Sequence, residues 1–252
     1  MRHEIWGNGM STDGTVCRNQ YQLVLDRRQT NFDSHFATTT LAAKHQLAHQ
    51  RLLDVEAVYA SVVGRRESRI FDLASQLLAD GLSQLACANY RLAFFCLRAF
   101  LEMSLAAIRF SAYEFELREW EAGIRDVTWT TLSNDDTGCF STSFVGAFFP
   151  QLKGEAKHYQ SLAKRAYREA SEYVHSNPKS HAPAHELSEA RADQWFELLD
   201  GASTAIVFCF LARYLHDIPK ERLHGDLLDI VTSEIGHFVA VQDFIAGHED
   251  NG

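Results

Sequence analysis

The sequence predicts an all-α fold, and three observations support this prediction. No proline occurs before Pro150, so no residue of that kind interrupts a helix in the first half of the chain. Six segments repeat their apolar residues at helical spacing. Only one run, residues 126–132, is strand-like, and a lone strand has no partner with which to form a sheet. We therefore expect one helical bundle with extra helices at its N- and C-terminal ends.

The predicted elements follow in order along the chain. Residues 1–33 are polar and weakly periodic, and we expect an N-terminal arm or an irregular cap there. Gly64 occupies the position that favours glycine after the first helix, and Asn89 suits an N-cap. One helix must end before Pro178, and Pro219 lies near the start of the last. The predicted helices cover about 35–63, 67–87, 89–113, 153–176, 186–216 and 220–246, with loops at 133–138 and 178–183. Residues 34–252 are expected to form a single domain.

Composition excludes several classes of protein. The chain has 24 Lys and Arg against 33 Asp and Glu, a net charge of −9, which argues against a protein that coats nucleic acid or an anionic membrane. Five cysteines without a C-x-x-C spacing indicate neither a disulfide framework nor structural zinc, and favour a cytoplasmic location. No signal-peptide pattern is visible. The longest apolar stretch, residues 202–215, is too short to span a bilayer, and we expect a buried core helix there.

A charged stripe interrupts the otherwise apolar helix 89–113. Arg91, Arg98, Glu102 and Arg109 are offset by 0, 7, 11 and 18 residues, which at about 100° per residue places them within about 20° of one line. One interpretation is a solvated helix edge, with Arg98 and Glu102 as an i,i+4 pair worth about 0.2–0.5 kcal/mol. The other interpretation is a polar groove that the fold keeps open for function.

Helix 153–176 carries a second polar stripe, opposite its apolar face. Lys157, Lys164, Arg168, Ser171 and His175 are offset by 0, 7, 11, 14 and 18 residues, again close to one line. A solvated face would explain the lysines. The position of His175 near the helix C-terminus also has a structural explanation, because a cation there complements the helix dipole.

Arg168 and His175 form the candidate catalytic pair. They are two helical turns apart, so both side chains project to the same side. A guanidinium binds phosphate through two parallel hydrogen bonds and keeps its charge, whereas a histidine exchanges a proton near neutral pH. Together they suit metal-independent RNA cleavage. The base removes the proton of a ribose 2′-OH, and the arginine stabilises the charge on the phosphoryl oxygens.

The run at 167–177, Tyr-Arg-Glu-Ala-Ser-Glu-Tyr-Val-His-Ser-Asn, resembles the signature of the HEPN superfamily. That signature is an Arg, usually followed by a polar residue, and a His after about four to six residues, near the end of a bundle helix. Arg168 and His175 have six residues between them, and Glu169 is the polar follower. The run Arg-Ala-Phe-Leu-Glu at 98–102 is similar to the central helix of bacterial HEPN-like proteins. The resemblance covers roughly residues 67–215.

The resemblance implies a bundle of four or five helices that often dimerises, so that two Arg–His pairs form one RNase centre at the interface. For this chain it implies a homodimeric endoribonuclease without cofactor or metal, acting as a toxin or antiviral defence effector on RNA and not on a membrane. Arg168 and His175 would be catalytic, and the expected substrate-binding residues are Lys157, Lys164, Ser171, Arg98 and Glu102. Many active members have Asn, Asp or His where this chain has Glu169. The alternative is a catalytically silent interaction or regulatory protein of a defence or toxin–antitoxin system, with an operon-encoded protein partner.

The histidines do not indicate a metal site. His175, His181 and His185 are close in sequence, but prolines separate them and prevent one continuous helix. His45 and His49 lie at i,i+4, without the glutamate of an H-E-x-x-H motif, and we expect them on a solvated helix face. A metal-dependent hydrolase is the third and most distant interpretation.

Overall fold

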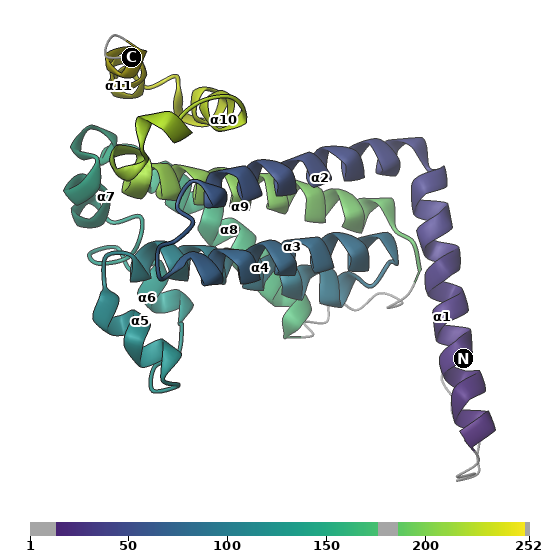
Figure 1. Cartoon of the computed structure of the whole chain (residues 1–252). Coiled ribbons are helices and arrows are strands. Elements are labelled where there is room, and N and C mark those ends of the chain that lie inside the picture. The colour runs from purple at the N-terminus through teal and green to yellow at the C-terminus, as the bar shows by residue number, and fades with distance from the viewer. Residues whose placement is uncertain (1–13, 176–185, 250–252) are drawn as a thin grey trace.

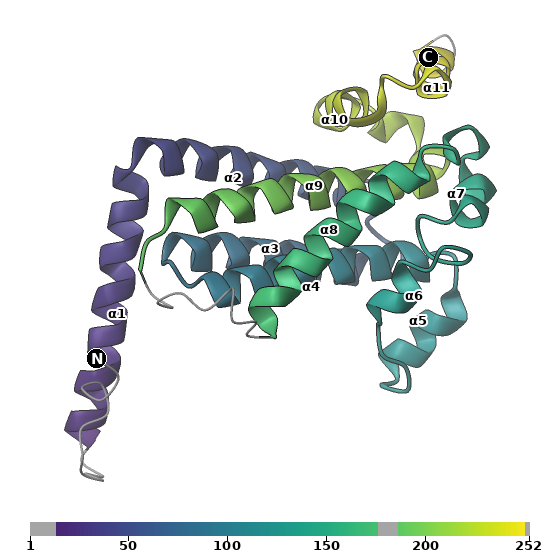
Figure 2. The same cartoon turned by 180° about the vertical axis from the view of Figure 1, so that it is seen from behind.

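The computed structural model describes residues 14–175 and 186–249, and these residues form helices and turns without a β-strand. The all-α prediction is therefore confirmed. The long helices α2, α3, α4 and α9 lie side by side, and α8 crosses them obliquely on the face seen in Figure 2. The α-helices are α1 (Gly14–Ala37), α2 (Thr39–Ala60), α3 (Ser68–Ala86), α4 (Tyr90–Phe110), α5 (Glu114–Glu121), α6 (Trp129–Leu132), α7 (Thr142–Phe148), α8 (Ala156–Val174), α9 (Glu189–Tyr214), α10 (Asp226–Ile235) and α11 (Val239–Glu249), with short 3-10 helices at Pro150–Leu152, Leu215–Asp217 and Lys220–Arg222.

The core is built around α4, which packs against α3, α8 and α9. Its side chains are buried on most sides, as expected for a helix that is apolar nearly all round. Phe94 stacks on Tyr173 of α8, with ring centroids 3.7 Å apart. On the α9 side, the Trp195 indole N–H donates a hydrogen bond to the Ala93 carbonyl at 3.0 Å. These contacts fix the α8 face that meets the core, and so also the face that meets solvent.

The segment predicted as a buried core helix, residues 202–215, is buried as expected. It forms the C-terminal half of α9 and the turn after it, and all but one of its side chains are buried. By length and composition, Glu189–Asp217 is the one segment of the described chain that is apolar enough to cross a membrane, and 72% of its most apolar part is buried inside the bundle. That burial is typical of the central helix of a helical bundle.

Residues 1–33 are predicted as an arm or an irregular cap; an irregular cap is wrong for residues 14–33, which belong to the continuous helix α1. The rest of the predicted arm, residues 1–13, lies outside the described residues. α1 meets α2 at a corner and extends beyond the bundle (Figure 1). Its periodicity was weak because its apolar side chains are spread around the helix and only His35 is buried. A helix that packs along so little of its length lacks the one-sided pattern of an amphipathic helix.

Two further predictions differ from the structure. The strand-like run 126–132 contains the one-turn helix α6. Thr128 is the N-cap of this helix, and its side chain accepts a hydrogen bond from the Thr131 amide. The predicted helix 220–246 is divided into a 3-10 turn, α10 and α11. Gly225, with φ of +54°, precedes α10, and Gly236 ends it. Glycine adopts a positive φ without steric cost, so the chain can turn at Gly225 before α10 begins.

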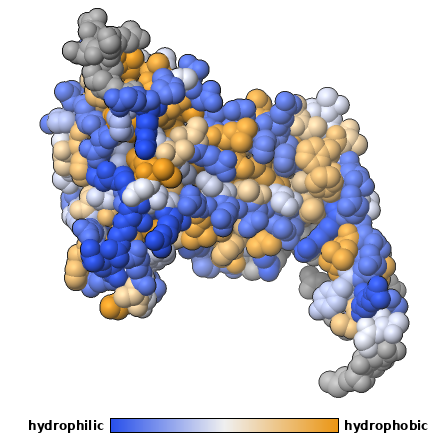
Figure 3. Space-filling model, viewed as in Figure 1, coloured by the Kyte–Doolittle hydropathy of each residue, from blue (hydrophilic) through white to orange (hydrophobic). Residues whose placement is uncertain are grey.

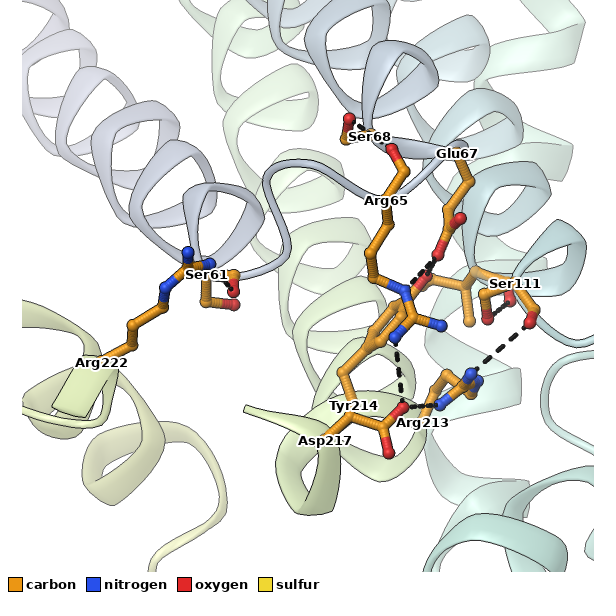
Figure 4. Close-up of polar contacts among 10 residues, drawn as sticks. Ser61, Arg65, Glu67, Ser68, Ser111, Arg213, Tyr214, Asp217 and Arg222 are labelled. Atoms are coloured by element: carbon orange, nitrogen blue, oxygen red, sulfur yellow. Dashed lines mark hydrogen bonds and ion pairs between the residues drawn. The ribbon is translucent and has the colours of Figure 1, made fainter. Parts of the chain in front are cut away.

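A balanced ion network closes the bundle where the α2–α3 turn meets the end of α9 (Figure 4). Arg65 bonds Glu67 at 2.7 Å, and the Tyr214 hydroxyl donates to the same carboxylate at 2.9 Å. Arg213 pairs with Asp217 at 2.7 Å, and Arg65 reaches that carboxylate at 3.4 Å. Two arginines thus face two carboxylates. Because every charge in this network has a partner, we assign it to stability rather than to ligand binding.

Candidate functional site

The packing of α8 determines which of its side chains reach solvent. Its small and aromatic residues are buried against α4 and α9, with Ala163, Ala166 and Ala170 nearly inaccessible. The opposite side of an α-helix must then face outward. Arg168 and His175 lie on that side and are both exposed. The structure therefore places the predicted catalytic pair at the surface, near the C-terminal end of α8.

Arg168 has a largely uncompensated charge. Its side chain is 73% exposed, and its nearest acidic partner, Glu169, is 3.9 Å away. Glu169 is instead bound by Arg165 at 3.0 Å and by the Gln194 amide at 3.2 Å. The carboxylate that follows Arg168 is thus directed to other groups, and the Arg168 guanidinium remains accessible to an anion.

His175 is the C-cap residue of α8. Its backbone N–H donates to the Ser171 carbonyl at 3.0 Å. Within the described residues, its imidazole has no hydrogen-bond partner. His175 and Arg168 are about 10.5 Å apart along the helix axis, at about 1.5 Å per residue. One phosphate group is smaller than this spacing. The pair in a single chain therefore marks two points on one face rather than a closed site.

The two lysines of the α8 stripe bind an acidic loop residue. Lys157 and Lys164 lie 3.3 and 3.1 Å from Oδ1 of Asp135, in the predicted loop 133–138. The Gln160 amide donates to the same oxygen at 2.9 Å. The Gln160 hydrogen bond, followed by those of the lysines, lowers the pKa of Asp135 to about 2. The carboxylate is therefore charged at any physiological pH and offsets part of the positive charge that was expected to bind substrate.

The remaining predicted binding residues meet between α4 and α8, around Tyr167. Arg98 donates to the Tyr167 hydroxyl at 2.8 Å and lies 3.4 Å from Glu102. The Ser171 hydroxyl donates to the Tyr167 carbonyl at 2.6 Å. Trp129 stacks on the Tyr167 ring, with centroids 4.1 Å apart. Burial raises the pKa of Glu102, and the nearby Arg98 guanidinium opposes this shift.

Sequence reasoning did not identify Tyr167 and Trp129 as parts of this cluster. Tyr167 directly precedes Arg168, and Trp129 lies in the strand-like run 126–132, so neither has a spacing that indicates contact. Their stacking depends on the path of the chain between α4 and α8, which local periodicity does not reveal.

The α4 stripe does not form one continuous surface. Arg91 is exposed, and Arg98 and Glu102 are partly buried. Arg109 is buried, with bonds to Glu116 at 2.7 and 2.9 Å and to the Thr137 carbonyl at 2.7 Å. Neither a solvated edge nor an open polar groove therefore describes the whole stripe, because at the C-terminal end of α4 Arg109 forms an ion pair in the interior.

The histidines also differ from expectation at one place. His49 is exposed as predicted, but His45 is partly buried and its Nδ1 lies 3.2 Å from Nε2 of His35. The expectation of a solvated face is wrong for His45 because α1 packs against it. Within the described residues, no group of three His, Cys, Asp or Glu side chains is close enough to hold a metal ion. His181 and His185 lie outside those residues.

Comparison with known proteins adds no relative: no family model, no curated protein and no solved structure matches this chain.

Proposed function

We propose that the protein is a metal-independent endoribonuclease in which Arg168 binds the scissile phosphate and His175 transfers the proton. The observation that carries this proposal is that Arg168 and His175 are both exposed and that, within the described residues, Arg168 has no close carboxylate partner. Both side chains are exposed on the same side of α8, and Glu169, the nearest acid to Arg168, is held by Arg165 and Gln194. Most other cations of the two stripes have carboxylate partners, which leaves Arg168 suited to an incoming phosphate.

The chemistry follows from these two groups. His175 as a neutral imidazole removes the proton of a ribose 2′-OH, and the oxygen attacks the adjacent phosphorus. Arg168 donates to the non-bridging oxygens as negative charge develops there. The P–O5′ bond then breaks, and the leaving 5′-oxygen takes a proton. The products are a 2′,3′-cyclic phosphate and a free 5′-hydroxyl, and no metal or oxidant is needed.

A second copy of the chain completes the site in this proposal. The proton donor for the leaving oxygen is a second imidazole, and the spacing of about 10.5 Å between Arg168 and His175 suits pairing across a two-fold axis. The first turns of α4, which lie beside the end of α8 through the Phe94–Tyr173 stack, present exposed Leu92 and Phe95. Apolar contacts of this kind offset the repulsion between two chains of net charge −9. The resemblance to HEPN proteins suggests a toxin or antiviral defence role in the cytoplasm.

The second candidate is a catalytically silent protein that binds a protein partner encoded nearby. One observation favours it: Lys157 and Lys164 share Asp135, and Arg98 is paired with Glu102. These internal pairs reduce the positive charge available for RNA. The same surface, with its exposed apolar residues on α4, would then serve as a protein interface.

RNA cleavage in EDTA separates the two candidates. Purified protein is incubated with tRNA, and His175→Ala, Arg168→Lys and His158→Ala are compared with the wild type. His158 is an exposed histidine on another side of α8, so its loss is the matched control. We expect His175→Ala to lower the rate by about 10²–10⁴-fold, and Arg168→Lys to impair it strongly because the bidentate contact is lost.

Each outcome has a definite meaning. Cleavage that persists at the wild-type rate in His175→Ala, with a lower melting temperature, would show that His175 is a structural cap. Cleavage that appears only with added metal would favour a metal-dependent hydrolase. A wild-type protein that binds but never cleaves RNA would favour the silent alternative.

A further inference from the structure

Among the residues that the structure describes, few pack on α1, and most of its surface is exposed. It is 24 residues long, about 36 Å, and His35 near its C-terminal end is its one buried residue. An isolated helix of this kind gains little stability in water, because most helical stability in proteins comes from tertiary packing. A partner surface is therefore expected for α1.

The apolar residues of α1 include a stripe that suits such a partner. Tyr21, Leu25, Phe32 and Phe36 are offset by 0, 4, 11 and 15 residues, within about 60° of one line, and all four are exposed. Arg18 lies at the edge of this stripe. Leu23 is also exposed but points to the opposite side of the helix. The four residues form two i,i+4 pairs that could anchor in a groove, although Val16, Leu23 and Val24 lie elsewhere around the helix.

A matching groove lies between α2 and α9. It has a volume of about 380 Å³, and its apolar floor includes Ala48, Phe196 and Leu199, with Leu47 70% exposed at its edge. The apolar surface continues from this groove to α1, because the His45 ring contacts both Phe196 and Phe36. Hydrophobic side chains are visible on both the α2 side of the bundle and α1 in Figure 3.

The charges of the groove and of α1 are complementary. Two cations at the groove, Lys44 and Arg51, are each bound by acids: Lys44 by Asp193, and Arg51 by both Asp200 and Glu234. Asp54 adds a further negative charge to the lining. The lining itself is balanced, and the carboxylates of Asp193 and Glu234 beside it make the surroundings of the groove acidic. α1 is basic on balance, with three arginines against two aspartates in a chain of net charge −9. Attraction between opposite charges favours α1 in such a groove.

We propose that α1 is a dimerisation arm that lies in the α2–α9 groove of a second copy of the chain. Both halves of the contact are present on one chain, so a two-fold axis creates the contact twice. Specific interfaces bury roughly 1,200–2,000 Å², so the doubled contact of two helices in two grooves suits a stable dimer better than one contact alone. The α2–α9 side and α8 are on different faces of the bundle (Figures 1 and 2), so this contact is separate from the pairing of α8 ends proposed above.

The test measures molar mass by sedimentation velocity at micromolar concentration in moderate salt. Leu25→Glu disables the arm, with Tyr21→Glu as a second arm variant, and Leu47→Lys disables the groove. Leu23→Glu is the matched control, since it adds the same charge to the other side of α1. We expect each arm or groove variant to have half the wild-type mass, and Leu23→Glu to keep the wild-type mass.

Mixing the variants tests the contact itself. A chain with a disabled arm still offers an intact groove, and a chain with a disabled groove still offers an intact arm. The mixture of Leu25→Glu and Leu47→Lys therefore regains assembly that neither has alone. A monomeric wild type, an arm variant of unchanged mass, or a mixture that does not assemble would overturn the proposal. His175 is not part of this contact, so we expect His175→Ala to keep the wild-type mass. The RNase proposal is tested separately, by the cleavage assay in EDTA, and either proposal can fail without the other.

Discussion

Nε2 of His35 lies 3.2 Å from Nδ1 of His45, at the corner where α1 meets α2. The rings of Phe36 and Phe196 surround this pair, and the described residues offer no hydrogen-bond partner to the buried Nδ1 of His35. Burial lowers the pKa of His35. Burial, followed by the charges of His35 and His49, lowers the pKa of His45 to about 4. The contact between α1 and the bundle therefore favours the neutral forms of both imidazoles.

The first prediction is that stability falls in mild acid. An unfolded chain protonates His45 near its ordinary pKa of 6.5, whereas the folded chain resists protonation until about pH 4. The stabilisation is thus complete above pH 6.5 and is lost progressively as the pH falls toward 4. Because solvent screens part of this effect at a partly exposed ring, we expect the melting temperature to drop by about 2–4 °C between pH 7 and pH 5. His45→Gln should reduce this dependence, and His49→Gln should not. Equal pH profiles in all three proteins would contradict the assignment.

The second prediction concerns Asp135 and rests on the proposed RNA binding. Asp135→Asn removes the negative charge that Lys157 and Lys164 share. Two cations then become available to phosphates, so RNA affinity should rise by roughly threefold to tenfold and depend more steeply on salt. Asp136→Asn, the neighbouring substitution with the same change in net charge, is the control. Fluorescence anisotropy of a labelled RNA across a salt series measures both quantities, and identical salt slopes for the two variants would refute the prediction.

The third prediction concerns the ion network at the end of the bundle. The Tyr214 hydroxyl donates to the buried Glu67 carboxylate, and hydrogen bonds to charged groups contribute about 1.5–3 kcal/mol. We expect Tyr214→Phe to lower the free energy of unfolding by about 1.5–2 kcal/mol in urea. Tyr113→Phe, at a partly exposed tyrosine that packs on Arg109, should change it by less than about 0.5 kcal/mol. A Tyr214→Phe protein as stable as the wild type would show that the network contributes little.

The fourth prediction compares two helical glycines. A Cβ atom at Gly81 in α3 would lie 3.2 Å from Cβ of Cys96 and 3.3 Å from the Trp195 ring. The crowding outweighs the helix propensity of alanine, so Gly81→Ala should cost about 1–2 kcal/mol. At Gly201 in α9, the nearest atom would be 4.0 Å away. Gly201→Ala should instead stabilise by about 0.5–1 kcal/mol. Thermal unfolding of the two variants checks the opposite signs, and a stabilising Gly81→Ala would show that the α3–α4 contact is looser than described.

The sequence by itself determined the helical fold and the faces of its central helices. The long apolar helices at α4 and α9 and the exposed side of α8 follow from periodicity, because residues three and four apart share one side of a helix. That local rule also placed Arg168 and His175 together at the surface. It needs no knowledge of what the helix packs against.

Tertiary structure decided the partners of those side chains. Asp135 binds Lys157 and Lys164, and Arg109 is buried against Glu116, although all three cations have the spacing of a solvated stripe. His45 is partly buried because α1 is a helix that packs on it, which no amphipathic pattern revealed. Such contacts join segments whose relative positions depend on the packing of the whole bundle. Local spacing gives the direction of a side chain, and only the assembled helices determine which group it meets.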